Sequence, residues 1–235
     1  MDNVLIVLTS TVNINNYKSH LQQRDPGERL TCYIKSITQW LEQTKLKICL
    51  IENSGYTFPE LNEYREKYSH RFEIITFNEF ENPPELQHLI YNCSKGASEM
   101  YSIIHAYKNT KFRDSVNFII KITCRYFVPS FETFLIEKGI LQNTRGVGIH
   151  DYDPMIIGLR QNNHDRCEIL GIHYKFFNML FELCLSDESG AFFPHVETVY
   201  ANRLKLLNQN KVISCPPFAI EETRMGGLDC IVTEL

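Results

Sequence analysis

The sequence lacks the features that mark membrane and secreted proteins. Its 235 residues contain no apolar run near the ~20 residues that a helix needs to cross a bilayer, because Lys121 interrupts the run from Phe118 to Ile122. The N-terminus has neither the basic segment nor the small-residue cleavage site of a secretory signal. We therefore expect a soluble cytoplasmic chain with no transmembrane segment.

The composition has no excess of positive charge. The 24 Lys and Arg residues are outnumbered by 28 Asp and Glu residues, which gives a formal net charge of −4. Binding to nucleic acid requires a basic surface that neutralises a run of phosphates, so we expect no nucleic acid partner. Any anion that the chain binds should be small and held by a few local side chains.

Cysteine pairs of the C-x-x-C type are missing as well. The eight cysteines are scattered, and several fall inside apolar segments, which favours reduced, mostly buried thiols over disulfides. The chain is 43% apolar and 22% charged, with only 11 Gly and 9 Pro, which excludes collagen-like and disordered classes. We expect a packed globular protein in which residues 1–235 form a single domain.

The first half of the sequence alternates between strand patterns and helix patterns. Short apolar runs indicate buried strands, and apolar residues at a 3.6-residue spacing indicate amphipathic helices. The predicted strands are Val4–Leu8, Lys47–Ile51, Phe72–Phe77 and Val116–Ile122, and the predicted helices are residues 28–41, Phe58–Tyr68 and a segment capped by Ser94. Continuous apolar strands alternating with helices are typical of a mainly parallel sheet covered on both faces, so the predicted fold class is α/β.

The second half has a less regular pattern. We expect a helix near Phe131–Glu137, strands near Val147 and Ile156, and helices near Ile172–Leu185 and Pro194–Leu207. No repeat, low-complexity tract or linker separates this half from the first, which supports the single-domain interpretation.

Polar side chains lie at the ends of the predicted strands, where open α/β sheets bind their ligands. These residues are Thr9, Ser10, Thr11, Glu52, Asn53, Ser54, Lys121, Thr123 and Arg125. Hydroxyl and amide groups can hydrogen-bond a base or a sugar, and Lys and Arg can neutralise phosphate oxygens. Alternatively, the small polar residues only form turns. No G-x-G-x-x-G or P-loop motif is present, which argues against a dinucleotide-binding Rossmann enzyme and a P-loop NTPase.

Four short segments form an ordered set of motifs. They are Glu28-Arg29…Tyr33…Ser36-Ile37…Trp40, Ile51-Glu52-Asn53-Ser54-Gly55-Tyr56, Lys95-Gly96-Ala97-Ser98-Glu99 and Lys121-Ile122-Thr123-Cys124-Arg125-Tyr126. Over roughly residues 4–135 the chain resembles GT-A-like glycosyltransferases of microbial and large-virus polysaccharide systems. The usual motifs of these enzymes are close to E-N-S-G-Y, K-G-x-G-E and K-I-T-G-R-Y. The chain departs from them at Ser98 and Cys124, which stand where the motifs have glycines.

The resemblance implies a GT-A-like, Rossmann-like fold with two functional halves. About residues 1–128 would bind a nucleoside diphosphate sugar, and about residues 129–235 would receive a saccharide acceptor. It also implies a role in polysaccharide or glycan synthesis. The expected location of the protein is the cytoplasm, with attachment to the periphery of a membrane as an alternative. For a viral chain the location would be the host cytoplasm. The donor-binding residues expected from the resemblance and the strand ends are Thr9, Ser10, Thr11, Arg29, Glu52, Asn53, Ser54, Lys95, Gly96, Glu99, Lys121, Thr123 and Arg125.

The predicted helix after Ser94 offers one place for the diphosphate. Lys95 and Gly96 lie at its start, where free N–H groups and the positive end of the helix dipole favour an anion. Glycine would also allow close approach of the backbone. The alternative is a solvated lysine in the first turn.

Two cations near the end of the fourth predicted strand offer a second place. Lys121 lies inside a strand predicted to be buried, so it needs either a ligand or a counter-ion, Glu52 or Glu99. Arg125 could bind two phosphate oxygens or a structural carboxylate. We favour the functional interpretation for both cations.

The sequence leaves metal dependence open. Many GT-A enzymes bind a divalent cation through a D-x-D pair after the fourth strand, where this chain has Thr123, Cys124 and Arg125. Asp151 and Asp153 have the spacing of a D-x-D pair. They form either a site for Mn²⁺ or Mg²⁺ or part of a turn. We prefer Lys and Arg as the source of positive charge, with a metal as the alternative.

Glu197 is the candidate catalytic base. An inverting transfer needs a carboxylate that takes the proton of the attacking acceptor hydroxyl. Glu197 lies in the first turn of a predicted helix opened by Pro194, away from the buried stripe of Val196, Val199, Tyr200, Leu204 and Leu207. The alternative is a carboxylate that only complements the helix dipole.

The function predicted from these observations is transfer of a sugar from a nucleoside diphosphate sugar to a saccharide acceptor. One alternative is a non-catalytic module that binds a nucleotide sugar or a glycan on the same fold. Another is a nucleotide-dependent methyltransferase, although the chain lacks the Gly-rich first loop expected of such an enzyme.

Overall fold

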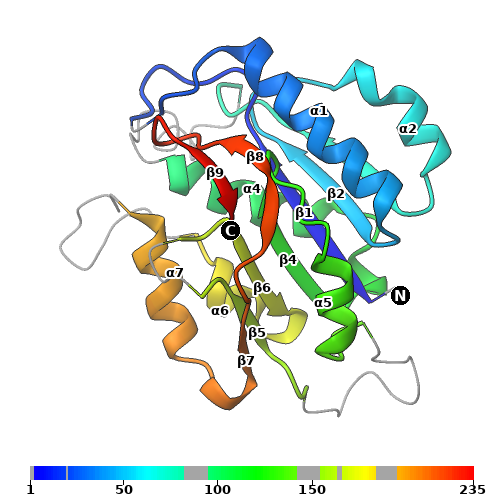
Figure 1. Ribbon diagram of the computed structural model, residues 1–235, viewed down its shortest axis with the longest axis vertical. Helices are drawn as coiled ribbons and strands as arrows, with labels where there is room; N and C mark the ends of the chain where they lie inside the picture. Colours follow the sequence, from blue (N-terminus) through cyan, green and yellow to red (C-terminus); the bar gives the residue numbers. More distant parts are fainter. Residues whose placement is uncertain (1–2, 20, 82–94, 142–153, 163–165, 184–194) are drawn as a thin grey trace.

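The computed structural model describes residues 3–19, 21–81, 95–141, 154–162, 166–183 and 195–235. Within these residues, seven strands form one sheet in the order β3-β2-β1-β4-β6-β5-β7 (Figure 1). The strands are β1 (Val4–Ser10), β2 (Lys47–Glu52), β3 (Phe72–Thr76), β4 (Phe118–Thr123), β5 (Gly158–Arg160), β6 (Ile169–His173) and β7 (Val212–Ser214). Both halves of the chain contribute strands to this sheet.

The sheet is mostly parallel. β1 pairs in parallel with β2 on one side and with β4 on the other, and β2 pairs in parallel with β3. β6 runs antiparallel to both β4 and β5, and β5 is parallel to β7. All residues of β1 and β2 are buried, as expected for strands covered on both faces. The α/β class predicted from the sequence is therefore confirmed.

Helices cover both faces of the sheet (Figure 1). They are α1 (Pro26–Gln43), α2 (Asn62–Lys67), α4 (Lys95–Asn109), α5 (Phe131–Glu137), α6 (Phe177–Phe181) and α7 (Val196–Lys205). One hydrophobic cluster joins the sheet to α1 and α5, and a second joins it to α4, α6 and α7. Successive residues of β1 contribute to opposite clusters, because side chains alternate along a strand.

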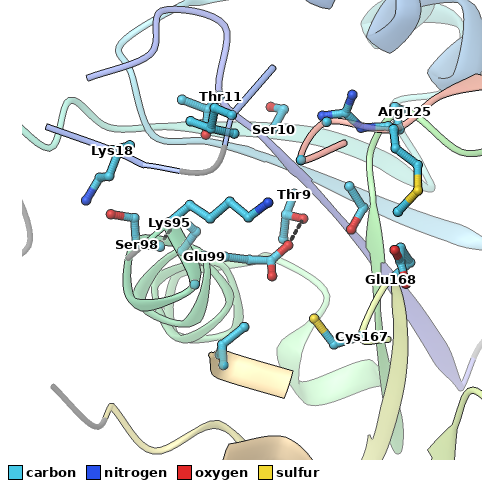
Figure 2. Close-up of a pocket in the computed structure, with 18 of the residues that line it drawn as sticks. Thr9, Ser10, Thr11, Lys18, Lys95, Ser98, Glu99, Arg125, Cys167 and Glu168 are labelled. Carbon is cyan, nitrogen blue, oxygen red and sulfur yellow. Dashed lines mark hydrogen bonds between the residues drawn. The ribbon is translucent and has the colours of Figure 1, made fainter. Parts of the chain in front are cut away.

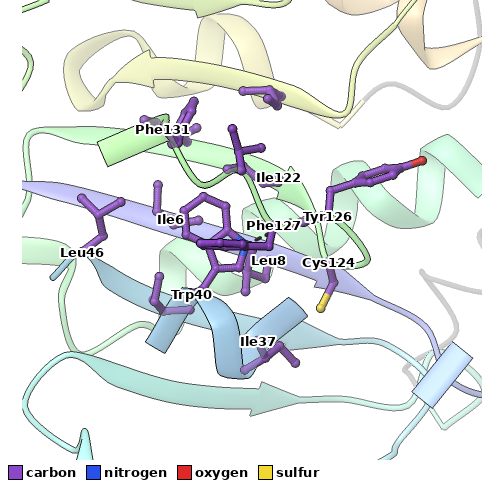
Figure 3. Close-up of a cluster of buried hydrophobic side chains, with 14 of the residues drawn as sticks. Ile6, Leu8, Ile37, Trp40, Leu46, Ile122, Cys124, Tyr126, Phe127 and Phe131 are labelled. Atoms are coloured by element: carbon purple, nitrogen blue, oxygen red, sulfur yellow. Dashed lines mark hydrogen bonds between the residues drawn. The ribbon is translucent and has the colours of Figure 1, made fainter. Parts of the chain in front are cut away.

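Trp40 lies at the centre of the first cluster (Figure 3). Its ring is fully buried and makes edge contacts with Phe127 and Phe131, at centroid distances of 5.1 and 6.0 Å. The indole Nε1 donates a hydrogen bond to the carbonyl of Tyr126 at 2.9 Å. This bond fixes the segment that follows β4 against α1, and so it positions Arg125 next to the end of the sheet.

The predicted helix Phe58–Tyr68 is divided into a 3₁₀ turn, Pro59–Leu61, and α2. The predicted helix Phe131–Glu137 has the bounds of α5. The helix predicted at Pro194–Leu207 is α7, which spans Val196–Lys205; Pro194 lies outside the described residues. The expected cap Ser94 and the strand expected near Val147 lie outside the described residues.

The prediction of a helix over Ile172–Leu185 was wrong for its first part. Ile172 belongs to β6, which is followed by the 3₁₀ turn Tyr174–Phe176 and the short helix α6. A fully buried strand has a continuous apolar run that cannot be told from a buried helix by periodicity alone. The strand expected near Ile156 starts two residues later, at Gly158.

The C-terminal segment contributes a feature that the sequence analysis missed. β8 (Ala219–Arg224) and β9 (Ile231–Glu234) form an antiparallel hairpin separate from the main sheet. In Figure 1 the tip of this hairpin lies beside the segment that precedes α1. The backbone N–H of Gln22 donates to the carbonyl of Gly226, which attaches the tip of the hairpin to that segment.

The structure bears on two expectations from the sequence, reduced cysteines and the absence of a membrane-spanning helix. Within the described ranges the cysteines are free, and Cys49, Cys124, Cys167 and Cys215 are buried. No helix in these ranges has the length and apolar character that a bilayer crossing requires.

His173 makes the stability of the fold depend on pH. Burial and the charge of Lys175 lower the pKa of His173 from 6.5 to about 4. The unfolded chain therefore takes up this proton near pH 6.5, whereas the folded chain resists it down to about pH 4. The stability contributed by neutral His173 is complete above pH 6.5 and is lost as the pH falls from there toward 4.

We expect the free energy of unfolding to fall by about 1–2 kcal/mol between pH 7 and pH 5 because of this residue. Urea denaturation at both pH values measures the fall. In the His173→Asn variant, which keeps an acceptor for the Lys175 N–H, the fall should be smaller. His70→Asn, at an exposed position, is the matched control. An equal fall in the wild type and His173→Asn would contradict the prediction.

Candidate active site

A cavity of about 830 Å³ lies at the carboxyl ends of β1, β2 and β4. The starts of α4 and α7, the residues that precede β6 and the tip of the β8–β9 hairpin complete its wall. In Figure 2, Lys95 and Glu99 extend from α4 into the cavity toward β1, and Arg125 lies on the opposite side from Lys18. The cavity lies where ligands bind in open α/β sheets.

Most of the residues predicted to form the site line this one cavity. They are Thr9, Ser10, Thr11, Arg29, Asn53, Lys95, Gly96, Glu99, Lys121, Thr123, Arg125 and Glu197. Glu52 and Ser54 are not part of its lining. Asp151 and Asp153 lie outside the described residues.

Lys121 pairs with Glu99 at the centre of the cavity wall. The two charged groups are 2.9 Å apart, and the Lys121 ammonium also donates to Thr123 Oγ1 and to the Cys167 carbonyl. Thr9 Oγ1 donates to the same Glu99 oxygen at 2.8 Å. Burial is the largest single effect and lowers the pKa of Lys121, but Glu99, Cys167 and Glu168 together raise it by more, so that the pKa lies above its usual value. The pairing with Glu99 is one of the two counter-ion alternatives of the sequence analysis.

Glu52 organises two loops beneath the cavity. Its carboxylate accepts hydrogen bonds from the backbone N–H groups of Val12, Ser54 and Tyr56 and from the Ser54 hydroxyl. Burial raises the pKa of Glu52, and the hydrogen bonds to its charged form act in the opposite direction. Gly55 completes this loop with a φ of 85°, which favours glycine. The E-N-S-G-Y segment therefore joins the loops after β1 and β2.

Arg29 and Ser10 also make contacts within the protein. The Arg29 guanidinium donates to the carbonyls of Thr11 and Gln23 and to the Tyr33 hydroxyl. The Ser10 hydroxyl donates to the carbonyl of Ile51. These two side chains hold the cavity wall in place, which is a structural contribution to the site.

Arg125, like Arg29, is a buried cation of the cavity, but only one of its guanidinium nitrogens, Nη1, donates to described partners. It is only 8% exposed, and no carboxylate in the part of the chain that the structure describes forms an ion pair with it. Its Nη1 donates to Gln23 Oε1 at 2.6 Å and to the Arg224 carbonyl at 3.4 Å. A Cβ atom on Gly226 would lie 2.4 Å from Nη2, which shows how closely the hairpin tip rests on the guanidinium. A buried guanidinium without a counter-ion is suited to an anionic ligand.

The start of α4 lies against the start of α7. A Cβ atom on Gly96 would lie 2.4 Å from Val196 Cβ, so glycine here permits close packing of the two helices. This packing role differs from the one predicted from the sequence, in which Gly96 allows an anion to approach the backbone. Lys95 lines the cavity one residue earlier, and the buried Ser98 hydroxyl, also in the lining, has no hydrogen-bond partner among the described residues.

Glu197 lies in the first turn of α7 and lines the cavity. Its Oε1 accepts a hydrogen bond from the Cys167 thiol at 3.7 Å. The structure thus brings the predicted base to the same cavity as the predicted donor-binding residues, although α7 and β1 are separated by most of the chain. Its role as the base stays a prediction.

Several lining residues were not found by sequence reasoning. Lys18 and Glu79 form a buried pair with 4.0 Å between Nζ and Oε1, and Glu168 reaches the cavity from the second half. Glu79 follows β3, so inspection of every strand end could have found it. The others are placed by tertiary structure, and no local pattern marks them.

The residues after β4 do not fit a divalent cation. Cys124 is completely buried with its thiol pKa raised by burial, and the neighbouring Arg125 carries a positive charge. No group of three or more His, Cys, Asp or Glu side chains suited to a metal occurs among the described residues. We therefore derive no catalytic step through a metal.

The comparisons with known proteins gave structural likeness only. No family model and no curated protein sequence matches the chain. Among solved structures, it is similar to a putative nucleotide-diphospho-sugar transferase from Desulfovibrio desulfuricans, with 10% identity and a TM-score of 0.47 over 92% of this chain and 80% of that one.

Two further structures also align with 92% of the chain. They are the glycosyltransferase GlyE of Streptococcus pneumoniae, at 9% identity and a TM-score of 0.48, and a cytidylyltransferase from Leptospira borgpetersenii, at 12% and 0.46. The chain spans 76% of the Leptospira chain but only 45% of the pneumococcal chain. At these values the likenesses assign no activity to this protein.

Proposed function

We propose that this protein transfers a sugar from a nucleoside diphosphate sugar to a saccharide acceptor. The observation that carries the proposal is Arg125, a buried cation without a carboxylate partner among the described residues, in a cavity at the carboxyl ends of the parallel strands. The four ordered motifs support a GT-A-like organisation and a setting in cytoplasmic polysaccharide synthesis.

The cavity has the chemical groups that the donor requires. A diphosphate is a compact anion, and the Arg125 guanidinium can donate to it from the atoms that Gln23 and Arg224 leave unused. Lys95 extends into the same cavity from the start of α4. Thr11 and Asn53 contribute hydroxyl and amide groups that can hydrogen-bond a base or a ribose.

The proposed reaction is a single displacement. The oxygen of an acceptor hydroxyl forms a bond to the anomeric carbon while the bond from that carbon to the diphosphate breaks. The Glu197 carboxylate takes the hydroxyl proton, and the nucleoside diphosphate leaves with the bonding electron pair, its charge balanced by Arg125.

A thermal-shift screen with UDP, GDP, CDP, ADP and their sugar conjugates tests donor binding. A ligand at about 100 times its dissociation constant stabilises the fold by roughly 2.7 kcal/mol, which gives a clear rise in melting temperature. Release of nucleotide is measured in parallel with a saccharide panel. Binding without release would favour the non-catalytic module, and the absence of any shift would contradict the proposal.

Arg125→Ala is expected to weaken nucleoside diphosphate binding about 10- to 150-fold, because charge-assisted contacts are lost. The fold should persist, since removal of this cation leaves no described carboxylate uncompensated. Isothermal titration measures the affinity, and Arg65→Ala, at an exposed position on α2, is the control. Equal affinity in both variants would show that Arg125 is structural.

Dialysis against a chelator is expected to leave the affinity for nucleoside diphosphates unchanged, because the proposed positive charge comes from side chains. Titration before and after dialysis measures this. A loss that Mn²⁺ or Mg²⁺ restores would instead indicate a metal site, for which Asp151 and Asp153 are the candidates from the sequence.

A further inference from the structure

Glu168 has an unsatisfied carboxylate in the wall of the cavity. It is half-buried, and its Oε2 is shielded from solvent without a hydrogen-bond partner among the described residues. Removing a carboxylate oxygen from water without giving it a donor costs free energy, so such a group needs an explanation. A ligand that brings hydrogen-bond donors would supply the missing partners.

The cations around Glu168 have other partners. Lys121 donates to Glu99, Thr123 and the Cys167 carbonyl. Arg166, two residues away in sequence, donates to the carbonyl of Glu234. Glu168 as a whole is only partly buried and lines the cavity, so a ligand there can reach its side chain.

The backbone around Glu168 is held rigidly. Its carbonyl accepts a hydrogen bond from the Thr123 N–H at 3.0 Å, and Ile169, which follows it, pairs with Ile122 at the start of β6. Because β6 is antiparallel to β4, its first residues lie at the edge where β4 ends. This topology places Glu168 beside the segment that carries Arg125, as Figure 2 shows.

Glu168 and Glu197 both line the cavity, and each is connected to Cys167. Cys167 precedes Glu168 in the chain, and its thiol donates to Glu197 Oε1. Both carboxylates line the cavity and are hydrogen-bond acceptors when ionised, which suits a ligand with several hydroxyl groups. Saccharides have this property, whereas the phosphates of a donor would be repelled.

We propose that Glu168 is a saccharide-binding residue, whose carboxylate accepts hydrogen bonds from hydroxyl groups adjacent to the one that reacts. The inference rests on the proposed function, since it assigns Glu168 to the same cavity. Glu168 fixes the orientation of the sugar, and Glu197 takes the proton. Arg125 thus binds the phosphate groups of the donor, and Glu168 binds the hydroxyl groups of a saccharide.

The test measures saccharide binding and nucleotide binding separately. The probes are the methyl glycosides of glucose, galactose, mannose, rhamnose and N-acetylglucosamine, titrated by saturation-transfer NMR with and without saturating UDP or GDP. The variants are Glu168→Ala, which removes the acceptor, and Glu168→Gln, which keeps one acceptor oxygen. Glu66→Gln, at an exposed position on α2, is the control.

We expect at least one glycoside to bind the wild type and the control, and Glu168→Ala to weaken it about 10- to 100-fold. Glu168→Gln should recover part of the loss, and the affinity for UDP or GDP should stay within about twofold in all variants. Partial recovery by glutamine distinguishes direct binding from a purely structural effect.

Three results would overturn the inference. They are no glycoside bound by the wild type, equal glycoside affinity in the wild type and Glu168→Ala, and a turnover of Glu168→Gln that no longer depends on pH, which would make Glu168 the proton acceptor. Failure of the proposed function has a different signature, because glycosides would then bind through Glu168 although no nucleoside diphosphate binds.

Discussion

The Glu197→Gln variant should turn over about 10² to 10⁴ times more slowly than the wild type. Glutamine keeps the size and shape of the side chain, but it cannot take a proton from the acceptor hydroxyl. The affinity for nucleoside diphosphates should be unchanged, because Glu197 lies in the first turn of α7 and its described contact is with the Cys167 thiol, not with Arg125. Nucleotide release and isothermal titration measure the two quantities.

Glu132→Gln is the matched control for the helix dipole. Glu132 also lies in the first turn of a helix, α5, but it does not line the cavity. If Glu197 only complemented the dipole, both variants would lose a similar few tenths of a kcal/mol of stability and keep their turnover. Turnover of Glu197→Gln within a few-fold of the wild type would remove this residue from the mechanism.

Lys121→Met is expected to lower the free energy of unfolding by about 3–5 kcal/mol, because it leaves the Glu99 carboxylate without its cation. Lys121 is fully buried, and among the described residues Glu99 would retain only the hydrogen bond from Thr9. Urea denaturation measures the change. The sequence alone favoured a functional role for Lys121, whereas its three protein partners lead us to expect a structural effect first.

The double variant Lys121→Met with Glu99→Gln should recover a large part of that stability, since no charge is then left unpaired. Lys108→Met, at an exposed position of α4, controls for the loss of a lysine. A stability of Lys121→Met equal to that of the control would contradict the importance of the buried pair.

The sequence predicted the first half of the fold well because its signals are local. The apolar run from Val4 and the helical spacing of Tyr33, Ile37 and Leu41 correspond to β1 and α1. The second half was harder to predict, because Ile169–His173 gains its identity as a strand only by pairing with β4. A short buried run has the same composition in either conformation.

The candidate site shows the same division. Thr9, Lys121 and Arg125 follow from the rule that ligands bind at the carboxyl ends of parallel strands. Glu168 could not be found in this way, because it precedes a strand that runs in the opposite direction. The identity of the partner of Lys121 also required the structure, since Glu52 and Glu99 were equal candidates and only tertiary packing places Glu99 of α4 beside β4.

The pairing of β1 has a consequence for synthesis of the chain on the ribosome. All seven residues of β1 are buried, yet one of its two neighbours, β4, begins only at Phe118. At about 5–20 residues per second, the ribosome takes roughly 4–14 s to travel from the end of β2 to the end of β4. During that interval the nascent chain carries an apolar strand with one open edge, a template for pairing with other chains. Translation speed through this stretch therefore sets how long aggregation can compete with folding.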